Sequence, residues 1–476
     1  MNDETKQKYG PAMTALTSLF FMVGFVTALN GILIPHLRGL FNLSPFTGQF
    51  VNSAFFIAYF VMGTPSSLLI KKVGYKMGCV AGLLVSALGA MLFFPAAGLQ
   101  SFPLFLVATF VLATGSTILQ TASNPFATLL GPPEGASSRL NMVQAFNSLG
   151  TTLAPWFGNL LILMVITDVM TQVQKAQAVR MPYGLVAGVF IVLAVLFAFF
   201  KLPDPAKLEK KEEGASVADT PFESLHKSAW GYKHLWLGVI GIFCYVGAEV
   251  AIGMNIIDFL SEKSVGGLTA SAAAVYVSIY WGGAMIGRFF GALWLTQEGR
   301  TSKKYGYSVA IILFAFLVGA FVTTKPLTMP TIVSAKYGLV FMGIAVANFI
   351  AFQIGKKSPR SSLGIFASIA GILVLIAVLA SGATAMWALI SVGFFNSIMF
   401  PTIFSLAVDK LGKHTHEGSG ALIMGIVGGA VIPPIYGMMA GYMGFQKGFI
   451  VCVLCYLYIA FFGIKGSVPE SIEKAA

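Results

Sequence analysis

The run from Leu235 to Leu260 reads LWLGVIGIFCYVGAEVAIGMNIIDFL. It is long and apolar enough to cross the hydrocarbon core of a bilayer as a helix, which takes about 20 residues. One acid, Glu249, stands in its middle, where a charge is costly and usually serves a function. The run therefore indicates a membrane-spanning helix that carries chemistry.

The composition extends this interpretation to the whole chain. Hydrophobic residues make up 57% of the 476 residues, charged residues make up 10%, and the mean hydropathy is +0.82. Soluble domains are nearer a quarter charged. These values exclude a soluble enzyme, a nucleic-acid binder and a disordered scaffold, and they predict a polytopic all-α membrane protein.

Fourteen apolar runs have the length of a membrane span, six before and eight after a charged segment. We predict an N-terminal six-helix bundle over 1–201, a cytoplasmic linker over 202–234 and a C-terminal bundle over 235–476. The predicted spans are 12–36, 46–70, 75–97, 101–126, 139–166, 182–201, 235–260, 269–295, 304–323, 337–355, 362–381, 384–408, 419–442 and 446–465.

The basic residues predict the orientation. With both termini in the cytoplasm, twenty-three of the 30 Lys and Arg residues fall inside and seven outside. This asymmetry agrees with the positive-inside rule. The net charge of +12 thus reflects topology and predicts no nucleic-acid partner.

Two multi-helix halves joined by a charged linker are typical of the major facilitator architecture, in which two six-helix bundles flank a central site. A weak internal repeat supports it. Gln120 stands five residues before Pro125, and Asn396 stands five residues before Pro401.

Four segments resemble the fucose:proton symporter family of the major facilitator superfamily, and within it the bacterial glucose/galactose branch. They are Phe20–Leu37 (FFMVGFVTALNGILIPHL), Gln120–Phe126 (QTASNPF), Arg139–Gly150 (RLNMVQAFNSLG) and Phe394–Ser405 (FFNSIMFPTIFS). The resemblance implies the major facilitator fold and cation-coupled hexose uptake in the bacterial inner membrane, with no cofactor besides co-transported Na⁺ or H⁺. Relative to fucose symporters, 304–355 is then an inserted helical hairpin.

The chain departs from the fucose symporters at two acidic positions. Those proteins carry an acid directly after the asparagine that matches Asn30, where this chain has Gly31. They also carry a glutamate at the position of Gln120. The proton mechanism of the fucose symporters therefore does not transfer directly to this sequence.

Amides within the spans are candidates for sugar binding, because they donate and accept hydrogen bonds as sugar hydroxyls do. Pairs three or four residues apart share one helix face. Such amides can equally bridge packed membrane helices, but their number here favours a pore-lining set. The candidates are Asn30, Gln120, Asn124, Gln144, Asn147 and Asn396. Tyr280 and Trp281 are added as an aromatic surface against which a sugar ring could stack.

Glu249 is the predicted cation-coupling residue, because it alone among the 18 acids falls in mid-span. A carboxyl at that depth must be protonated, paired or bound to a cation. Arg288 is placed at the cytoplasmic end of its span, where we expect it to be too shallow to neutralise Glu249. The glucose/galactose branch includes sodium-coupled members, so the resemblance favours sodium over a proton.

Other functions stay open at this point. An uncoupled facilitator or an exporter would use the same residue types. A polytopic membrane enzyme is disfavoured because the spans carry no cluster of carboxylates, His or Lys at their ends. His414 and His416 lie beside Lys413 and Glu417 in a predicted loop, so no metal site is predicted. The partners expected are a hexose, a cation and the bilayer, with the protein a monomer.

Overall fold

The chain folds almost entirely into helices. The computed structural model describes residues 3–43, 45–158, 170–199, 226–296, 300–323, 331–355 and 358–469, and within these ranges it holds no β-strand. The predicted all-α fold is confirmed. Residues 202–225 of the predicted linker lie outside the described residues.

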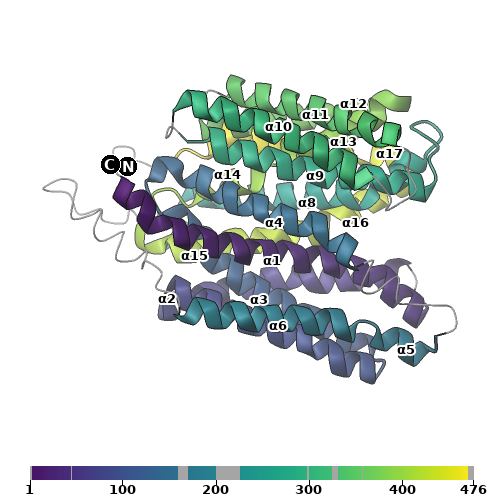
Figure 1. Ribbon diagram of the computed structural model, residues 1–476, viewed down its shortest axis with the longest axis horizontal. Helices are drawn as coiled ribbons and strands as arrows, with labels where there is room; N and C mark the ends of the chain where they lie inside the picture. The colour runs from purple at the N-terminus through teal and green to yellow at the C-terminus, as the bar shows by residue number, and fades with distance from the viewer. Residues whose placement is uncertain are drawn as a thin grey trace, which may run out of the picture. The chain divides into compact units, whose positions relative to one another are not determined.

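The longer helices follow the predicted spans in order along the chain (Figure 1). They are α1 (Asp3–Phe41), α2 (Pro45–Gly98), α3 (Phe102–Leu129), α4 (Ala136–Gly158), α6 (Arg180–Phe199), α8 (Lys233–Ser261), α9 (Ala270–Trp294), α10 (Thr301–Thr323), α11 (Thr331–Ile354), α12 (Pro359–Leu379), α13 (Gly382–Asn396), α14 (Met399–Ala407), α15 (Thr415–Met424), α16 (Gly428–Met443) and α18 (Ile450–Phe461). Two short helices, α5 (Gln172–Gln177) and α17 (Phe445–Gly448), precede α6 and α18.

The helices form two compact units. One unit comprises 1–131, 149–231 and 410–427, and the other comprises 132–148, 232–409 and 428–476. We call them unit 1 and unit 2. The predicted division into 1–201, 202–234 and 235–476 uses continuous stretches of the chain, whereas each unit combines separate stretches. That division stays a prediction.

Eleven stretches in the described part of the chain are long and apolar enough to cross a membrane. This number does not confirm the fourteen predicted spans. The longest stretch, Phe50–Gly98, belongs to α2, which is broken at Gly74 (φ 80°, ψ 167°). Glycine adopts such positive φ values at little cost, so α2 consists of two helical segments that meet at Gly74.

Small residues let neighbouring helices approach closely within unit 1. A Cβ atom added at Gly89 would lie 2.3 Å from the backbone nitrogen of Leu112, and one at Gly115 would lie 2.3 Å from that of Ser86. Membrane helices have no hydrophobic drive toward one another, so close backbone packing of this kind stabilises their association. The α2 segment that follows Gly74 thereby packs against α3.

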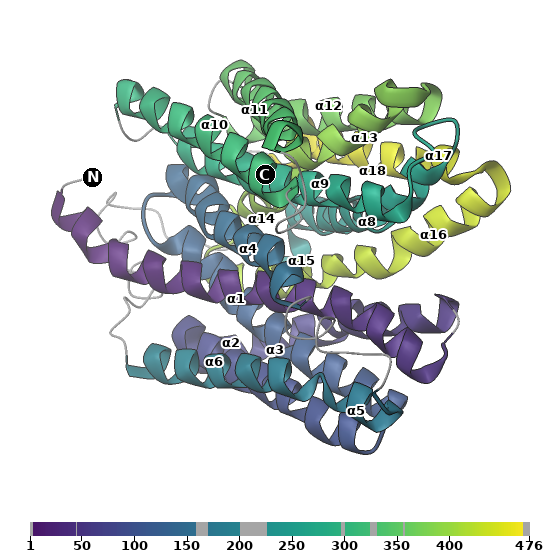
Figure 2. The ribbon, with the colours of Figure 1, turned by 45° about the vertical axis from the view of Figure 1, so that its right-hand side comes forward.

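In unit 2, α10 and α11 lie side by side and contact α9 (Figure 2). Among the eleven candidate spans they are the least buried, with 28% and 33% of their most apolar windows buried. Apolar side chains on an outer helix face are what a bilayer covers. These two helices form the hairpin that the sequence predicts as an insertion.

Candidate functional site

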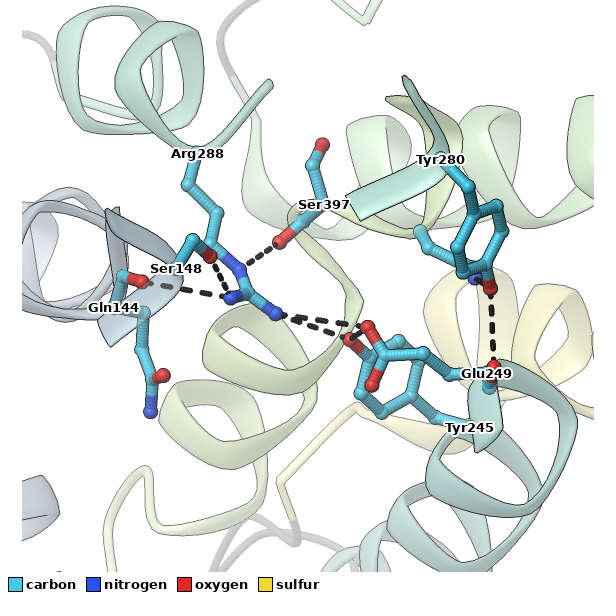
Figure 3. A network of polar contacts seen from close by, with 8 residues as sticks. Gln144, Ser148, Tyr245, Glu249, Tyr280, Arg288 and Ser397 are labelled. Carbon is cyan, nitrogen blue, oxygen red and sulfur yellow. Dashed lines mark hydrogen bonds and ion pairs between the residues drawn. The ribbon is translucent and has the colours of Figure 1, made fainter. Parts of the chain in front are cut away.

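A polar network is buried among the helices of unit 2, and Arg288 of α9 lies at its centre (Figure 3). Its guanidinium donates to the carbonyl of Ser397 (Nε to O, 3.0 Å), to the carbonyl of Gln144 (3.4 Å) and to the hydroxyl of Ser148. It also donates to the Tyr245 hydroxyl at 3.2 Å. One side chain thus joins α4, α8, α9 and the segment between α13 and α14.

The carbonyl of Ser397 is available to Arg288 because of Pro401. In a helix this carbonyl would accept from the N–H four residues later, but proline has no N–H. The helix is interrupted there: α13 ends at Asn396 and α14 begins at Met399. A freed carbonyl inside a membrane protein needs another donor, and Arg288 supplies it.

Glu249 of α8 belongs to the same network. Its Oε1 accepts from the Tyr245 hydroxyl at 2.5 Å and lies 3.7 Å from Nη2 of Arg288. The Arg288 and Glu249 side chains are only 9% and 12% exposed. The expectation that Arg288 is too shallow to neutralise Glu249 was therefore wrong.

Side-chain direction explains how Arg288 reaches Glu249. Side chains on an α-helix lean toward its N-terminus, and Arg288 stands near the C-terminal end of α9. Its long side chain therefore extends back along the helix to the level of Glu249. The position of Arg288 within its span indicates the depth of its Cα atom but not the depth of its guanidinium.

Tyr280 and Asn396, both predicted as site residues, are linked to this network. The Tyr280 hydroxyl donates to the backbone carbonyl of Glu249 at 3.2 Å and accepts from Nδ2 of Asn396 at 2.7 Å. Both residues are buried. A Cβ atom at Gly393 would lie 2.2 Å from the carbonyl oxygen of Tyr280, so a residue without a side chain is what allows α9 and α13 to approach this closely.

The other predicted residues of unit 2 are Gln144, Asn147 and Trp281, and their contacts differ. Gln144 is bonded to Arg288 through its backbone carbonyl, while its side-chain amide points away from the guanidinium (Figure 3). Asn147 is half-buried on α4. The rings of Trp281 and Tyr280 are 5.2 Å apart in an edge-to-face arrangement.

Three predicted residues belong to unit 1. Gln120 donates to the Tyr59 hydroxyl at 2.9 Å, and Asn124 is fully buried one turn further along α3. Asn30 lies on α1, but its side chain is outside the described part of the structure.

The helix that carries Gln120 repeats the proline arrangement of unit 2. Pro125 lies within α3 and frees the carbonyl of Thr121, which accepts from the Ser419 hydroxyl at 2.9 Å. Each unit therefore has a proline that exposes a carbonyl, and a side chain from another helix that bonds to it. This local similarity supports the repeat read from the spacing of Gln120 and Asn396 to their prolines.

Four members of the network were absent from the predicted site: Arg288, which was expected to lie too shallow, and Tyr245, Ser148 and Ser397. Signals for two of them are present in the sequence. Tyr245 stands four residues before Glu249, on the same helix face, and Ser397 stands four residues before Pro401. Nothing in the sequence distinguishes Ser148 from other serines in the spans.

No group of three or more His, Cys, Asp or Glu side chains that could hold a metal ion occurs in the described part of the chain. What the network offers is a carboxylate, an arginine, two tyrosine hydroxyls and an amide. These groups can bind hydroxyl-bearing solutes, and the carboxylate can exchange a proton.

Comparison with known proteins agrees with this chemistry. The glucose/galactose transporter of Brucella abortus biovar 1 (strain 9-941) is 44% identical over 468 residues, which cover 97% of this chain and 96% of that protein. The L-fucose-proton symporter of Escherichia coli (strain K12) is 31% identical, with 94% and 91% covered. A structure of the transporter FucP in the outward conformation matches with a TM-score of 0.72 at 29% identity, over 96% of this chain and 98% of that one.

The family model that matches the chain, over residues 16–354, is that of the Major Facilitator Superfamily. This match and the relatives confirm the predicted fold family and the prediction that the protein is not an enzyme. The chain belongs to the Major Facilitator Superfamily, and within it to the family that contains the glucose/galactose transporters and the L-fucose-proton symporters.

Proposed function

We propose that this protein takes up a hexose of the glucose/galactose type, together with a cation, across the bacterial inner membrane by alternating access. The relatives named as glucose/galactose transporters support the substrate class. The observation that carries the coupled mechanism is the buried Arg288–Glu249–Tyr245 cluster, which is joined through Tyr280 to Asn396. A group that changes charge thus lies next to groups suited to sugar hydroxyls.

The surroundings of Glu249 favour a proton rather than the sodium ion that the resemblance favours. A sodium site needs several oxygen ligands, whereas Glu249 has a guanidinium 3.7 Å away, and that positive charge opposes a second cation. A proton needs only the carboxyl. Relatives named as L-fucose-proton symporters support the same choice.

Protonation of Glu249 would change what holds Arg288. The guanidinium would lose its counter-charge and keep its neutral acceptors: the carbonyls of Ser397 and Gln144 and the hydroxyls of Ser148 and Tyr245. Because these groups come from α4, α8 and the α13–α14 break, the proton on Glu249 would bias the packing of three elements. Such a bias is what couples a proton to a conformational change.

The membrane topology is also a proposal. We infer fourteen crossings, with two from α2 on either side of Gly74 and one each from α4 and α9. Both termini and the linker would then be cytoplasmic, as the basic residues predict. Arg288 no longer counts among the cytoplasmic charges, since it lies in the buried network, but the asymmetry persists without it.

Cysteine labelling would test this topology. In a variant without the four native cysteines, single cysteines are placed at Lys303, Lys336 and Arg360. A membrane-impermeant thiol reagent should label position 336 in intact cells, and positions 303 and 360 only after the membrane is opened. Labelling of 336 and 303 from the same side would contradict a crossing by α10.

The substitutions Gln144→Leu and Asn147→Leu would test sugar recognition. Loss of one hydrogen bond that leaves a polar partner unpaired costs about 1–3 kcal/mol, so sugar affinity should fall about five- to a hundredfold. Because Gln144 contacts Arg288 through its backbone, the Gln144→Leu change leaves that contact in place. Met142→Leu, at an exposed position of α4, is the control. Unaltered affinity in both variants would assign these amides to helix packing.

The function itself is tested by counterflow of labelled sugars in proteoliposomes, with and without imposed proton or sodium gradients. Exchange of a hexose, with accumulation that follows the proton gradient, is the expected result. Exchange that ignores both gradients would instead favour an uncoupled facilitator, which is the alternative reading of the same site.

A further inference from the structure

One buried amide lies on the helix pair that the sequence predicts as an insertion. Leu339 and Ile350 of α11 are 56% and 51% exposed, as expected of residues that face lipid. Asn348, on the same helix, is fully buried, and its Nδ2 donates to the carbonyl of Phe394 at 2.9 Å. The Asn348 amide, on a helix that exposes apolar side chains, is therefore directed at α13.

The carbonyl that Asn348 contacts belongs to the end of α13. The last four carbonyls of a helix lack a partner within the helix, and α13 ends at Asn396. A carbonyl without a donor in an apolar interior is costly. Asn348 satisfies one such group at Phe394, and Arg288 satisfies the carbonyl of Ser397, which lies in the break itself. The break between α13 and α14 is thus held by α9 and by α11.

Aromatic packing adds to this hold. The ring of Phe341, also on α11, meets the ring of Phe394 edge to face with centroids 5.0 Å apart. A Cβ atom at Gly283 of α9 would lie 2.5 Å from the Phe394 ring. Phe394 is therefore enclosed between α9 and α11, with little room to move.

The enclosed residue stands two positions before a member of the polar network. Asn396 donates to the Tyr280 hydroxyl, which in turn donates to the backbone of Glu249. Displacement of the Phe394 carbonyl would shift the turn that carries Asn396. The hydrogen bond from Asn348 consequently constrains a group of the candidate sugar site that it does not touch.

We propose that Asn348 is a positioning residue for transport, and that the α10–α11 hairpin is thereby a working part of the sugar site. The hairpin fixes the α13–α14 break, so that Asn396 and the Ser397 carbonyl keep their places beside Tyr280 and Arg288. The role in transport rests on the proposed function, whereas the hold on the break does not.

The test compares Asn348→Leu, which keeps the approximate size and removes the donor, with Asn348→Gln, which keeps a donor on a longer arm. Val346→Leu, at an exposed position of α11, is the control. Amide hydrogen exchange of the peptide 394–400 should be about five- to a hundredfold faster in Asn348→Leu than in wild type, which is the range for one lost hydrogen bond. Asn348→Gln should exchange at an intermediate rate.

The second readout is hexose counterflow. The half-saturation concentration should rise by a similar factor in Asn348→Leu while the maximal rate changes less. The effect should be non-additive with Asn396→Leu, because both changes act on one hydrogen-bonded group. Unchanged exchange of 394–400, or a stability loss with unchanged half-saturation, would overturn the proposal. A wild-type protein that moves no hexose would refute the proposed function, while the hydrogen-exchange result would still decide whether Asn348 holds the break.

Discussion

Replacement of Glu249 by glutamine is expected to abolish sugar accumulation driven by a proton gradient while sugar exchange continues. Glutamine has nearly the size of glutamate and can still accept from Tyr245, so the network keeps its shape. It cannot gain or lose a proton, so the energy of the gradient no longer reaches the sugar. The variant resembles the protonated state that the wild type would visit in every cycle.

The expected size of this effect follows from the gradient. A potential of 100 mV provides about 2.3 kcal/mol per charge, and one pH unit about 1.4 kcal/mol. Together they would let a one-to-one symporter concentrate sugar several hundredfold. Glu249→Gln should bring sugar only to equal concentrations on both sides, with counterflow rates close to those of wild type.

Proteoliposomes with an imposed pH gradient and potential would provide the measurement. Asp258→Asn is the matched control, because it removes an acid from an exposed position on the same helix. It should accumulate sugar as the wild type does. Concentrative uptake by Glu249→Gln under a proton gradient would place the coupling at another residue.

The sequence was a good guide to the position of the buried carboxyl of Glu249 and a poor one to its partner. Glu249 stands out because a carboxyl in an apolar run is costly wherever the helix lies. Its pairing with Arg288 depends on which helices are neighbours and on the direction in which a long side chain leans. Neither property can be read from hydropathy, which reports the length of a span and not its surroundings.

The candidate amides show the same limit. Asn396 was predicted from its residue type and lies in the network, bonded to Tyr280. Gln144 was predicted for its side chain, but its backbone carbonyl is the atom that contacts Arg288. Residue type indicates which groups could bond, and the fold decides which atom does. Proline is an exception, because it identifies the atom as well as the residue. Pro401 has no N–H, so it predicts that the carbonyl of Ser397, four residues earlier, lacks its helical partner. Arg288 donates to that carbonyl.

Replacement of Arg288 by glutamine is expected to be the most destabilising change in the network. It would leave the Glu249 carboxylate buried without its counter-charge, and loss of one partner of a buried pair costs about 3–5 kcal/mol. Uptake of a proton by Glu249 would reduce part of that cost. The carbonyls of Ser397 and Gln144 would also lose their shared donor.

The change Glu249→Gln should lower the stability much less than Arg288→Gln, because Arg288 has more hydrogen-bond partners in the protein than Glu249 has. Without the Glu249 charge, Arg288 keeps two carbonyls and two hydroxyls as acceptors. Without Arg288, the carboxylate keeps the hydroxyl of Tyr245. The double variant Glu249→Gln/Arg288→Gln should then be more stable than Arg288→Gln alone, since no unpaired charge remains and two neutral amides can bond to each other.

Unfolding in detergent micelles, followed by tryptophan fluorescence, would give the free energies for the cycle of wild type, two single variants and the double variant. Arg300→Gln, at an exposed position before α10, controls for loss of a positive charge. The coupling energy should exceed about 1 kcal/mol, because contacting partners are non-additive by about 0.5–3 kcal/mol. Effects that add within about 0.5 kcal/mol would show that the two side chains do not stabilise each other, and the link between proton and packing would then have to run through another contact.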